Sequence, residues 1–218
     1  MIPKIIHYCW FGRNPKPQKV VEYIKQWHKL LPDYEIKEWN EDNFDVEAMA
    51  FTREAYKVKK YAFVSDVCRF YALAHDGGIY LDTDVRLIKS FDNFLNCDSF
   101  IGKEVPFLLS TAVIGANKDC LWIKEFYNTY ENKHFITSKG NINNQENTTI
   151  LTMFLNRNYP RFFDELEIYD IDYFCAKIYK SKEYLVTKNT IAIHEFSATW
   201  VSRLTFKNRL RNLIIRYF

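Results

Sequence analysis

The chain has 218 residues, 48% hydrophobic and 26% charged, which predicts a soluble globular protein with a sizeable core. A formal net charge of +3 is too small to indicate a nucleic-acid-binding protein, and the five scattered cysteines contain no Cys-x-x-Cys pair that would predict a zinc site. Unpaired thiols suit a reducing cytoplasm, and we expect no signal peptide, because the first apolar stretch is short and carries Lys4 and His7. The sequence contains no apolar run of about 18 residues that would span a membrane.

The beginning of the chain predicts a strand, a helix and a second strand. Residues 4–10 form a short, mostly apolar run that is typical of a buried strand. Apolar residues then recur at helical spacing from residue 20 to residue 31, and Pro32 ends that pattern. Residues 34–39 alternate between polar and apolar side chains, as a strand does. Short connections between these elements predict a βαβ unit in a parallel sheet.

The middle of the chain predicts a second helix over residues 61–75, followed by Gly77 and Gly78 as a left-handed cap. A strand over residues 79–81 then runs into an Asp-Thr-Asp sequence. The remaining predicted elements are a strand region at 107–116, helices at 119–130 and 148–155, and strands at 184–186 and 190–193. This order predicts one mixed α/β domain over residues 1–218.

A pair of carboxylates, Asp82 and Asp84, follows the third predicted strand. In an extended chain these two side chains face the same side and can meet one hard cation, which prefers oxygen ligands. Ligands of open parallel sheets bind beyond the carboxyl ends of the strands, where this pair is expected to lie. The pattern alone is a weak indication, because most Asp-x-Asp sequences are turns or solvated surface.

Asp66 and Arg69 lie three residues apart on the preceding helix and share one face of it. Asp66 could accept hydrogen bonds from sugar hydroxyls, and Arg69 could hold Asp66 or the sugar in place. Spacing alone favours the simpler interpretation, which is an ordinary helical ion pair.

Residues 62–84 combine the patterns A-x-x-S-D-x-x-R, G-G-x-Y and D-x-D. The combination resembles the sugar-binding region of the DXD glycosyltransferases, and more narrowly glycosyltransferase family 32. That family includes initiating mannosyltransferases of yeast and bacterial capsule enzymes, and it is related to the clostridial glucosylating toxins. The resemblance implies a GT-A fold, a single Rossmann-like domain with a mostly parallel central sheet.

The resemblance also implies an activity. It implies a retaining transfer of a hexose from a nucleotide sugar, with UDP favoured over GDP, and manganese or magnesium as cofactor. The acceptor would be a glycan or a lipid-linked oligosaccharide in capsular polysaccharide biosynthesis. Retention could occur by front-face attack or through an enzyme nucleophile, and the sequence marks no residue as that nucleophile.

Site residues follow from the same resemblance. The residues expected to act on the donor are Asp66, Arg69, Asp82 and Asp84. Those expected to bind the nucleotide part are His7, Trp10, Tyr80, Asp82, Thr83 and Trp200. The expected metal ligands are Asp82 and Asp84, with either His194 or Glu195 from the C-terminal segment. Trp10 could instead be a core residue, and Trp39 is expected to pack.

The segment 201–218 contains five basic residues and no acidic one, with apolar residues between them. As a helix it would be basic and amphipathic, which suits peripheral contact with an anionic membrane surface. Docking of the same helix on the domain is an equally good interpretation.

Two other function classes compete with the transferase. A carbohydrate- or nucleotide-binding protein without turnover would bind the donor and release no nucleotide. A metal-dependent phosphohydrolase would need further clustered His or Asp ligands, which the five scattered histidines do not suggest.

Overall fold

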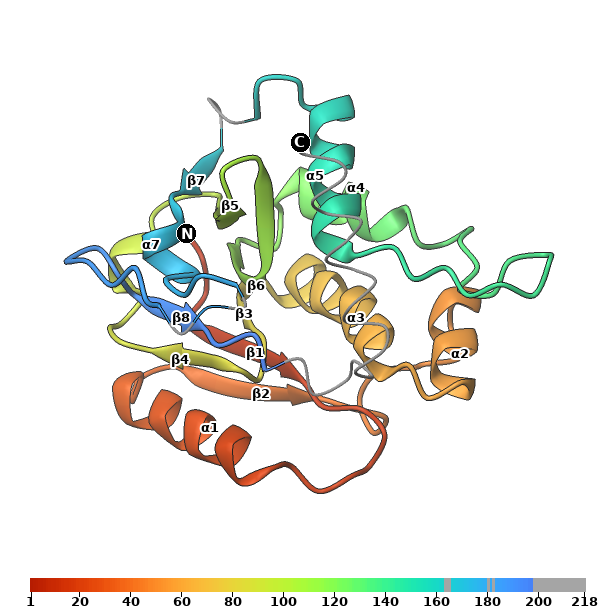
Figure 1. The fold of residues 1–218 in the computed structure, drawn as a ribbon, viewed down its shortest axis with the longest axis horizontal. Helices are drawn as coiled ribbons and strands as arrows, with labels where there is room; N and C mark the ends of the chain where they lie inside the picture. Colours follow the sequence, from red (N-terminus) through yellow and green to blue (C-terminus); the bar gives the residue numbers. More distant parts are fainter. Residues whose placement is uncertain (163–165, 180, 182, 198–218) are drawn as a thin grey trace.

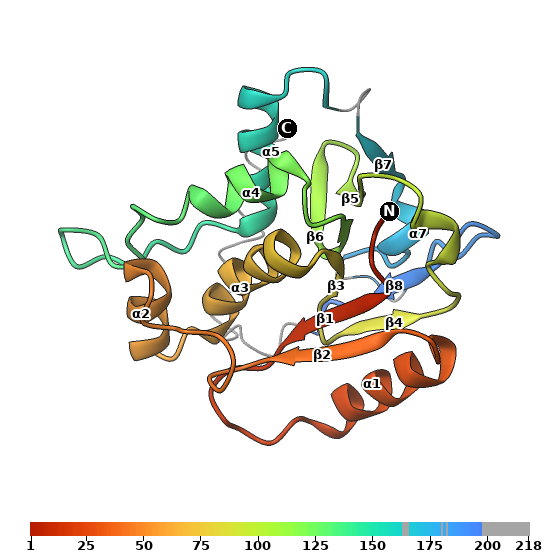
Figure 2. The same ribbon diagram turned by 180° about the vertical axis from the view of Figure 1, so that it is seen from behind.

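The computed structural model describes residues 1–162, 166–179, 181 and 183–197. A six-stranded sheet lies between a layer of helices on one face and a helix with a small second sheet on the other (Figures 1 and 2). The predicted mixed α/β architecture with a mostly parallel central sheet is therefore confirmed. The predicted tail helix over 201–218 and Trp200 lie outside the described residues.

The strand order of the central sheet is β2-β1-β3-β6-β5-β7. The bounds are β1 Ile5–Cys9, β2 Glu35–Trp39, β3 Gly78–Leu81, β5 Ser99–Val105, β6 Leu108–Ala116 and β7 Glu167–Tyr169. Neighbouring strands are parallel except around β6, which is antiparallel to both β3 and β5. The second sheet pairs β4 (Val85–Leu87) with β8 (Ala192–His194) in antiparallel fashion. The predicted parallel βαβ unit is thus confirmed at the start of the chain.

Helices cover the two faces of the central sheet. Their bounds are α1 Gln18–Leu30, α2 Ala50–Lys57, α3 Tyr61–Asp76, α4 Leu121–Asn128, α5 Asn147–Asn158 and α7 Ile171–Phe174, with a short 3-10 helix η1 at Asp92–Phe94. One apolar core lies between the sheet and the layer that α2, α3, α4 and α5 form, and the other lies on the side of α1 and β4. Strand β3 serves both cores, because Tyr80 faces the first and its neighbours Ile79 and Leu81 face the second.

Several features differ from the predicted elements. The helices α2 and α7 and the strands β4, β5 and β7 were not predicted, and the strand expected at 184–186 is wrong. In that segment Tyr184 forms only an isolated bridge with Lys177. Val186 and its neighbours are exposed, so a run of apolar letters there does not mark a buried strand.

Gly77 and Gly78 connect α3 directly to β3. Both have positive φ, but Gly77 combines φ +65° with ψ −168°, so the predicted left-handed helical cap is wrong in detail. This extended conformation is accessible essentially to glycine alone. At Gly78 (φ +106°) a Cβ atom would lie 2.6 Å from the carbonyl oxygen of Ile5. The two glycines therefore allow the tight approach of α3 to the sheet that places the site.

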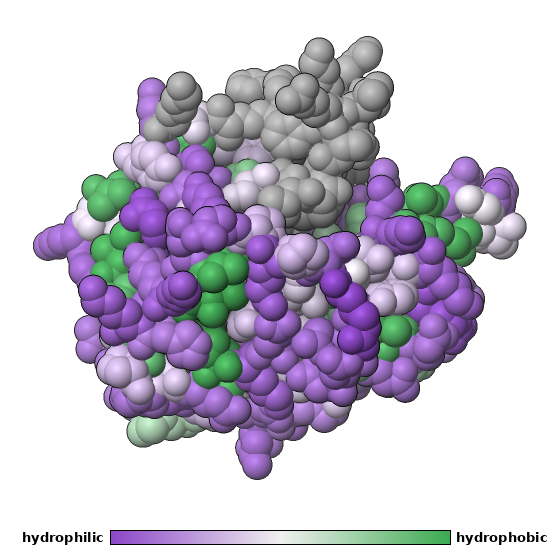
Figure 3. Space-filling model, turned by 90° about the horizontal axis from the view of Figure 1, so that it is seen from below, coloured by the Kyte–Doolittle hydropathy of each residue, from purple (hydrophilic) through white to green (hydrophobic). Residues whose placement is uncertain are grey.

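The outer surface on the side of α1 is mainly hydrophilic, with apolar side chains in small groups (Figure 3). The amphipathic pattern of α1 explains this, since it buries Val20, Tyr23 and Trp27 and exposes its charged face. None of the helices in the described part of the chain has the length and apolar character needed to cross a bilayer.

His7 lies in the middle of β1 and is completely buried. Its Nε2 atom is 2.6 Å from the carbonyl oxygen of Gly77, and its Nδ1 atom accepts a hydrogen bond from Trp39 Nε1 at 3.0 Å. Burial, partly offset by the Gly77 carbonyl, lowers the pKa of His7 from 6.5 to about 4. A proton on Nδ1 would also face the N–H group of Trp39, so the folded state requires the neutral ring.

We expect this histidine to make the fold acid-sensitive. Below pH 6.5 His7 is protonated in the unfolded chain but stays neutral in the folded protein. The free energy of unfolding therefore decreases as the pH is lowered from 6.5 to about 4, the pKa of His7 in the folded protein. The loss between these limits should reach roughly 3 kcal/mol. Denaturant unfolding at several pH values should show this slope, and His7→Gln should flatten it. An NMR titration of His7 near pH 6.5 in the folded protein would contradict the expectation.

Candidate active site

The end of β3 and the turn after it carry the aspartate pair. The backbone N–H of Asp82 still pairs with the carbonyl of Ala112 on β6 at 2.9 Å. The N–H of Val85 then bonds back to the carbonyl of Asp82 at 3.0 Å, so residues 82–85 form a tight turn. The expectation that the pair continues an extended strand is therefore wrong. The turn is anchored from behind by Trp27 of α1, whose Nε1 donates to the Val85 carbonyl at 3.0 Å.

Arg69 joins the helix α3 to this turn. Its Nη2 lies 3.1 Å from a carboxylate oxygen of Asp66 and 3.1 Å from one of Asp82. Its Nη1 donates to the carbonyl of Thr111 at 2.7 Å, and its guanidinium lies over the ring of Tyr80. The predicted ion pair on one helix face is confirmed, but it also includes Asp82. One cation thus holds two carboxylates in fixed positions.

The charge of Arg69 is well protected, because its side chain is only 5% exposed. Burial alone would lower the pKa of the guanidinium, but Asp82, Tyr80 and Asp66 together raise it. Tyr80 also donates to the same Asp82 oxygen at 2.9 Å. Among the buried polar side-chain atoms of the described residues, Nε of Arg69 has no hydrogen-bond partner.

Asp84 meets the C-terminal segment through the small second sheet. In that sheet Val85 pairs with His194, which brings the imidazole next to the carboxylate. His194 Nε2 lies 3.3 Å from Asp84 Oδ1, and the backbone N–H of Ser197 donates to Oδ2 at 2.7 Å. Residues more than 100 positions apart in the sequence therefore form one site, and the adjacent N–H of Glu195 bonds to the Asp84 carbonyl at 3.0 Å.

The charges of this pair stabilise each other. Burial favours the neutral forms, yet the Asp84 carboxylate raises the pKa of His194 well above its usual value. In turn, His194 and the Ser197 N–H overcome burial and lower the pKa of Asp84. A cation that bound here would have to displace the imidazole proton, since a ligating histidine is neutral.

Asp82, Asp84 and His194 can serve as one metal-ligand set. Each offers a ligand atom, and these atoms all lie within 4.8 Å of one another. Carboxylate oxygens with one imidazole nitrogen suit manganese, and magnesium less well because it prefers oxygen ligands alone. The set is part-buried, with Asp84 18% and Asp82 26% exposed, so a ligand could still reach it.

Glu195, the other residue considered as a ligand, points elsewhere. Its carboxylate accepts hydrogen bonds from Arg86, Lys177 and Tyr184 at 2.9 to 3.1 Å. Burial acts to raise the pKa of Glu195, but these donors lower it. Three donors use the lone pairs that a metal would need, so the geometry favours His194 over Glu195.

A cavity of about 740 Å³ opens over the aspartates, within the range of sites for small organic ligands. The predicted site residues that line it are Trp10, Asp66, Arg69, Tyr80, Asp82, Thr83, Asp84 and His194. Neither His7 nor Glu195 is among the lining residues. His7 is held by Gly77 and Trp39 in the interior, which leaves no face for a nucleotide. Trp39 packs as predicted, buried against His7 and Tyr71.

Several cavity residues were missed in the sequence. The start of α5 contributes Glu146, Asn147 and Thr148, and β5 contributes Glu104. Asn147 is buried and bridges α5 to the site, because its Nδ2 donates to the Asp66 carbonyl at 3.3 Å and its Oδ1 accepts from Tyr130. The position of Asn147, a polar residue at the start of a helical pattern with apolar residues after it, was the feature of the sequence that could have indicated its role.

Known proteins resemble part of this chain in sequence, and one solved structure resembles it in fold. The sequence family described as the glycosyltransferase sugar-binding region containing the DXD motif matches residues 17–101. Inositol phosphoceramide mannosyltransferase 3 of Schizosaccharomyces pombe is 33% identical over 126 residues, which cover 54% of this chain and 34% of that protein. Subversion of eukaryotic traffic protein A of Legionella pneumophila is 27% identical over 167 residues, which cover 64% of this chain and 23% of that protein. The predicted family resemblance is confirmed.

The solved structure of PaToxG Glycosyltransferase superimposes with a TM-score of 0.57 at 18% sequence identity. The superposition covers 75% of this chain and 72% of that one, and it confirms the predicted GT-A fold. The chain spans between 23% and 42% of the length of these and the other curated relatives that it resembles.

Proposed function

We propose that the chain is a glycosyltransferase of the kind that has a DXD sugar-binding region, and that it transfers a hexose from a nucleotide sugar to a hydroxyl group of a glycan or lipid-linked glycan. The observation that carries the proposal is the convergence of Asp82, Asp84 and His194 beside the Asp66–Arg69 pair at one cavity. A binding protein would need such a cavity too, but not three ligating side chains within reach of one cation.

One group of residues would bind the metal ion, and a second group would bind the donor sugar. Asp82, Asp84 and His194 would hold manganese or magnesium, which when bound neutralises the charge that develops on the departing diphosphate. Asp66, fixed by Arg69, would accept hydrogen bonds from the sugar hydroxyls.

The nucleotide part would lie along the wall formed by the loop after β1. Trp10 lines this wall, and its Nε1 is bonded to the Asn14 carbonyl at 2.7 Å, which fixes the orientation of the indole. An aromatic face held in this way suits stacking of a base. Tyr80 and Thr83 would lie near the diphosphate and ribose.

Finer features of the proposal come from the family. We include retention of configuration at the anomeric carbon, a UDP-linked donor and a role in capsular polysaccharide synthesis. The relative in Schizosaccharomyces pombe is by its name a mannosyltransferase that acts on inositol phosphoceramide, which makes GDP-mannose the second donor to test and supports a lipid-linked acceptor. Membrane contact through the basic segment 201–218 would bring such an acceptor close.

A panel of nucleotide sugars tests the proposed function. The protein is incubated in separate reactions with UDP-glucose, UDP-galactose, UDP-N-acetylglucosamine and GDP-mannose. Each donor is tested once with manganese and once with a chelator in its place, and release of the nucleoside diphosphate is measured. We expect release from one donor or a few, and only with the metal. Binding of donors without release from any of them would instead identify a binding protein.

A further inference from the structure

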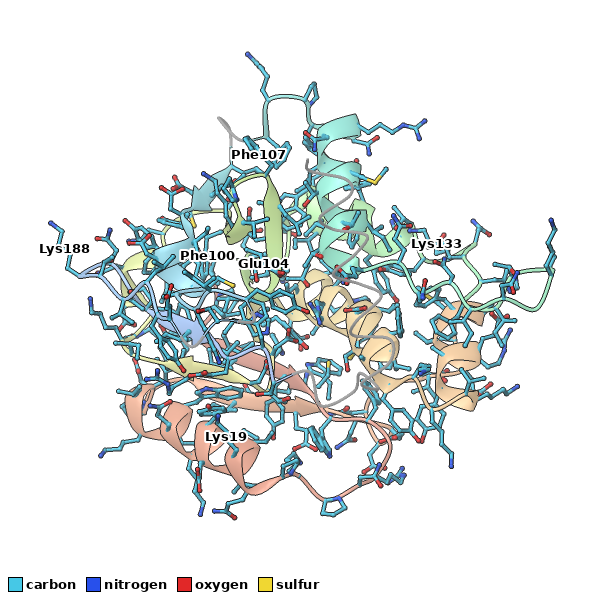
Figure 4. All side chains as sticks on the ribbon, in the orientation of Figure 1. Lys19, Phe100, Glu104, Phe107, Lys133 and Lys188 are labelled. Carbon is cyan, nitrogen blue, oxygen red and sulfur yellow. The ribbon has the colours of Figure 1, made fainter. Side chains whose placement is uncertain are left out.

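Glu104 is an acidic residue of the cavity wall that the proposed donor site does not use. It lies near the end of β5, one position before Val105, and lines the same cavity as the aspartates. Figure 4 labels Glu104 near the middle of the view and Phe107, at the tip of the same hairpin, above it. Glu104 is part-buried, whereas Phe107 is exposed. Its neighbour Lys103 points the other way and pairs with Asp170 at 2.8 Å.

A bulge in the β5–β6 hairpin produces this orientation. Lys103 pairs with Leu109 and Val105 with Leu108, so Glu104 is an extra residue without a partner on β6. Bulges of this kind occur beside active sites, where they redirect a side chain. The pairing register of β5 and β6 shifts a second time between Ile101 and Gly102. The β6 residues opposite this shift include Thr111 and Ala112, which also line the cavity.

The carboxylate of Glu104 has no countercharge of its own. Arg69 is shared by Asp66 and Asp82, and His194 pairs with Asp84. Within the described part of the chain, no side chain or backbone group forms a hydrogen bond or ion pair with Glu104. A carboxylate that lines a polar cavity without a partner is suited to accept hydrogen bonds from a ligand.

Electrostatics agree with a position between the metal-ligand set and α5. Burial raises the pKa of Glu104 to about 7, and the charges that act on it are those of His194, Glu146 and Asp82. The charges of the metal-ligand set and of the start of α5 thus act on Glu104, which lines the same cavity. The ligand atoms of the proposed metal set do not include it.

We propose that Glu104 binds the acceptor, by accepting a hydrogen bond from the hydroxyl group that attacks the donor sugar. This inference rests on the proposed function. In the transfer, the bond between the anomeric carbon and the diphosphate oxygen breaks, and a bond from the acceptor oxygen to that carbon forms. The single hydroxyl proton is shared between Glu104 and the departing diphosphate oxygen in a three-centre hydrogen bond and leaves on the diphosphate, so Glu104 orients the hydroxyl without keeping its proton.

The test compares Glu104→Ala and Glu104→Gln with the control variant Lys103→Ala, which alters the same bulge on its outer side. The fastest donor of the panel is used with manganese, and the acceptors are water and methyl mannoside. We expect Glu104→Ala to lower kcat by roughly 10- to 100-fold for both acceptors, because the hydroxyl loses its orientation. The KM for the donor should stay within about 2-fold of the wild-type value, because donor binding is untouched.

Glu104→Gln should lose much less activity than Glu104→Ala, because its amide oxygen can accept the same hydrogen bond, and Lys103→Ala should behave as the wild type. Wild-type kcat in Glu104→Ala would overturn the inference. So would a raised donor KM with unchanged kcat, which would assign Glu104 to the donor, or an equal loss in both variants, which would assign it a proton-accepting role. A wild-type protein that releases no nucleotide would be a failure of the proposed function itself.

Discussion

Replacing Asp84 with asparagine is expected to lower nucleotide release by roughly 100- to 1000-fold while the protein stays folded. The amide retains an oxygen for the N–H of Ser197, so the turn keeps its hydrogen bond. The metal-ligand set, however, loses one of its two negative charges, and with it much of its affinity for a divalent cation. Manganese titration, nucleotide release and thermal unfolding of the same preparation measure the three effects.

Two further variants decide which residue completes the ligand set. His194→Ala should weaken manganese binding as Asp84→Asn does. Glu195→Gln should leave manganese binding intact, because Glu195 is engaged with Arg86, Lys177 and Tyr184. The opposite pattern, with manganese binding lost only in Glu195→Gln, would make Glu195 the ligand and refute the assignment to His194.

Replacing Arg69 with leucine is expected to abolish activity and to destabilise the fold by about 3 to 5 kcal/mol. Its guanidinium is 5% exposed and separates the carboxylates of Asp66 and Asp82, which would then lose the cation they share. The Thr111 carbonyl would also lose its donor. Denaturant unfolding measures the stability, and nucleotide release measures the activity.

Arg69→Lys and Arg13→Ala are the controls for this prediction. Lysine keeps the charge, but its single nitrogen cannot occupy the separate positions of Nη1, which bonds to Thr111, and Nη2, which pairs with Asp66 and Asp82, so stability should recover more than activity does. Arg13 forms an exposed pair with Asp42, and its loss should leave the unfolding midpoint unchanged. Equal stability of Arg69→Leu and the wild type would contradict the buried role of Arg69.

The sequence predicted the parallel part of the fold well because its signals there are local. Periodicity and the stops at Pro32 and Gly77 define β1, α1, β2, α3 and β3 closely. It missed β5, whose Gly102, Lys103 and Glu104 break the strand pattern at bulges. The bulges depend on how β5 meets β6, which no local pattern encodes. The direction of β6 depends in the same way on its pairing with β3.

The site was predicted where its residues lie close together in the sequence, and less well where they do not. Asp66, Arg69, Asp82 and Asp84 lie within one helix-strand unit, and the family pattern marked all four. The choice between His194 and Glu195 depended on the register of β4 with β8, which brings position 194 opposite Val85. His7 was assigned to the nucleotide by the family resemblance of the first strand, but strand alternation turns it inward to Trp39.

The central claim is that Asp82, Asp84 and His194 bind the cation that also contacts the diphosphate of the donor. The most direct measurement is a crystal structure with UDP and manganese, in which anomalous diffraction locates the metal. We predict an anomalous peak between these three side chains and a diphosphate oxygen. A bound diphosphate with its manganese elsewhere, and these side chains turned away from it, would contradict the account.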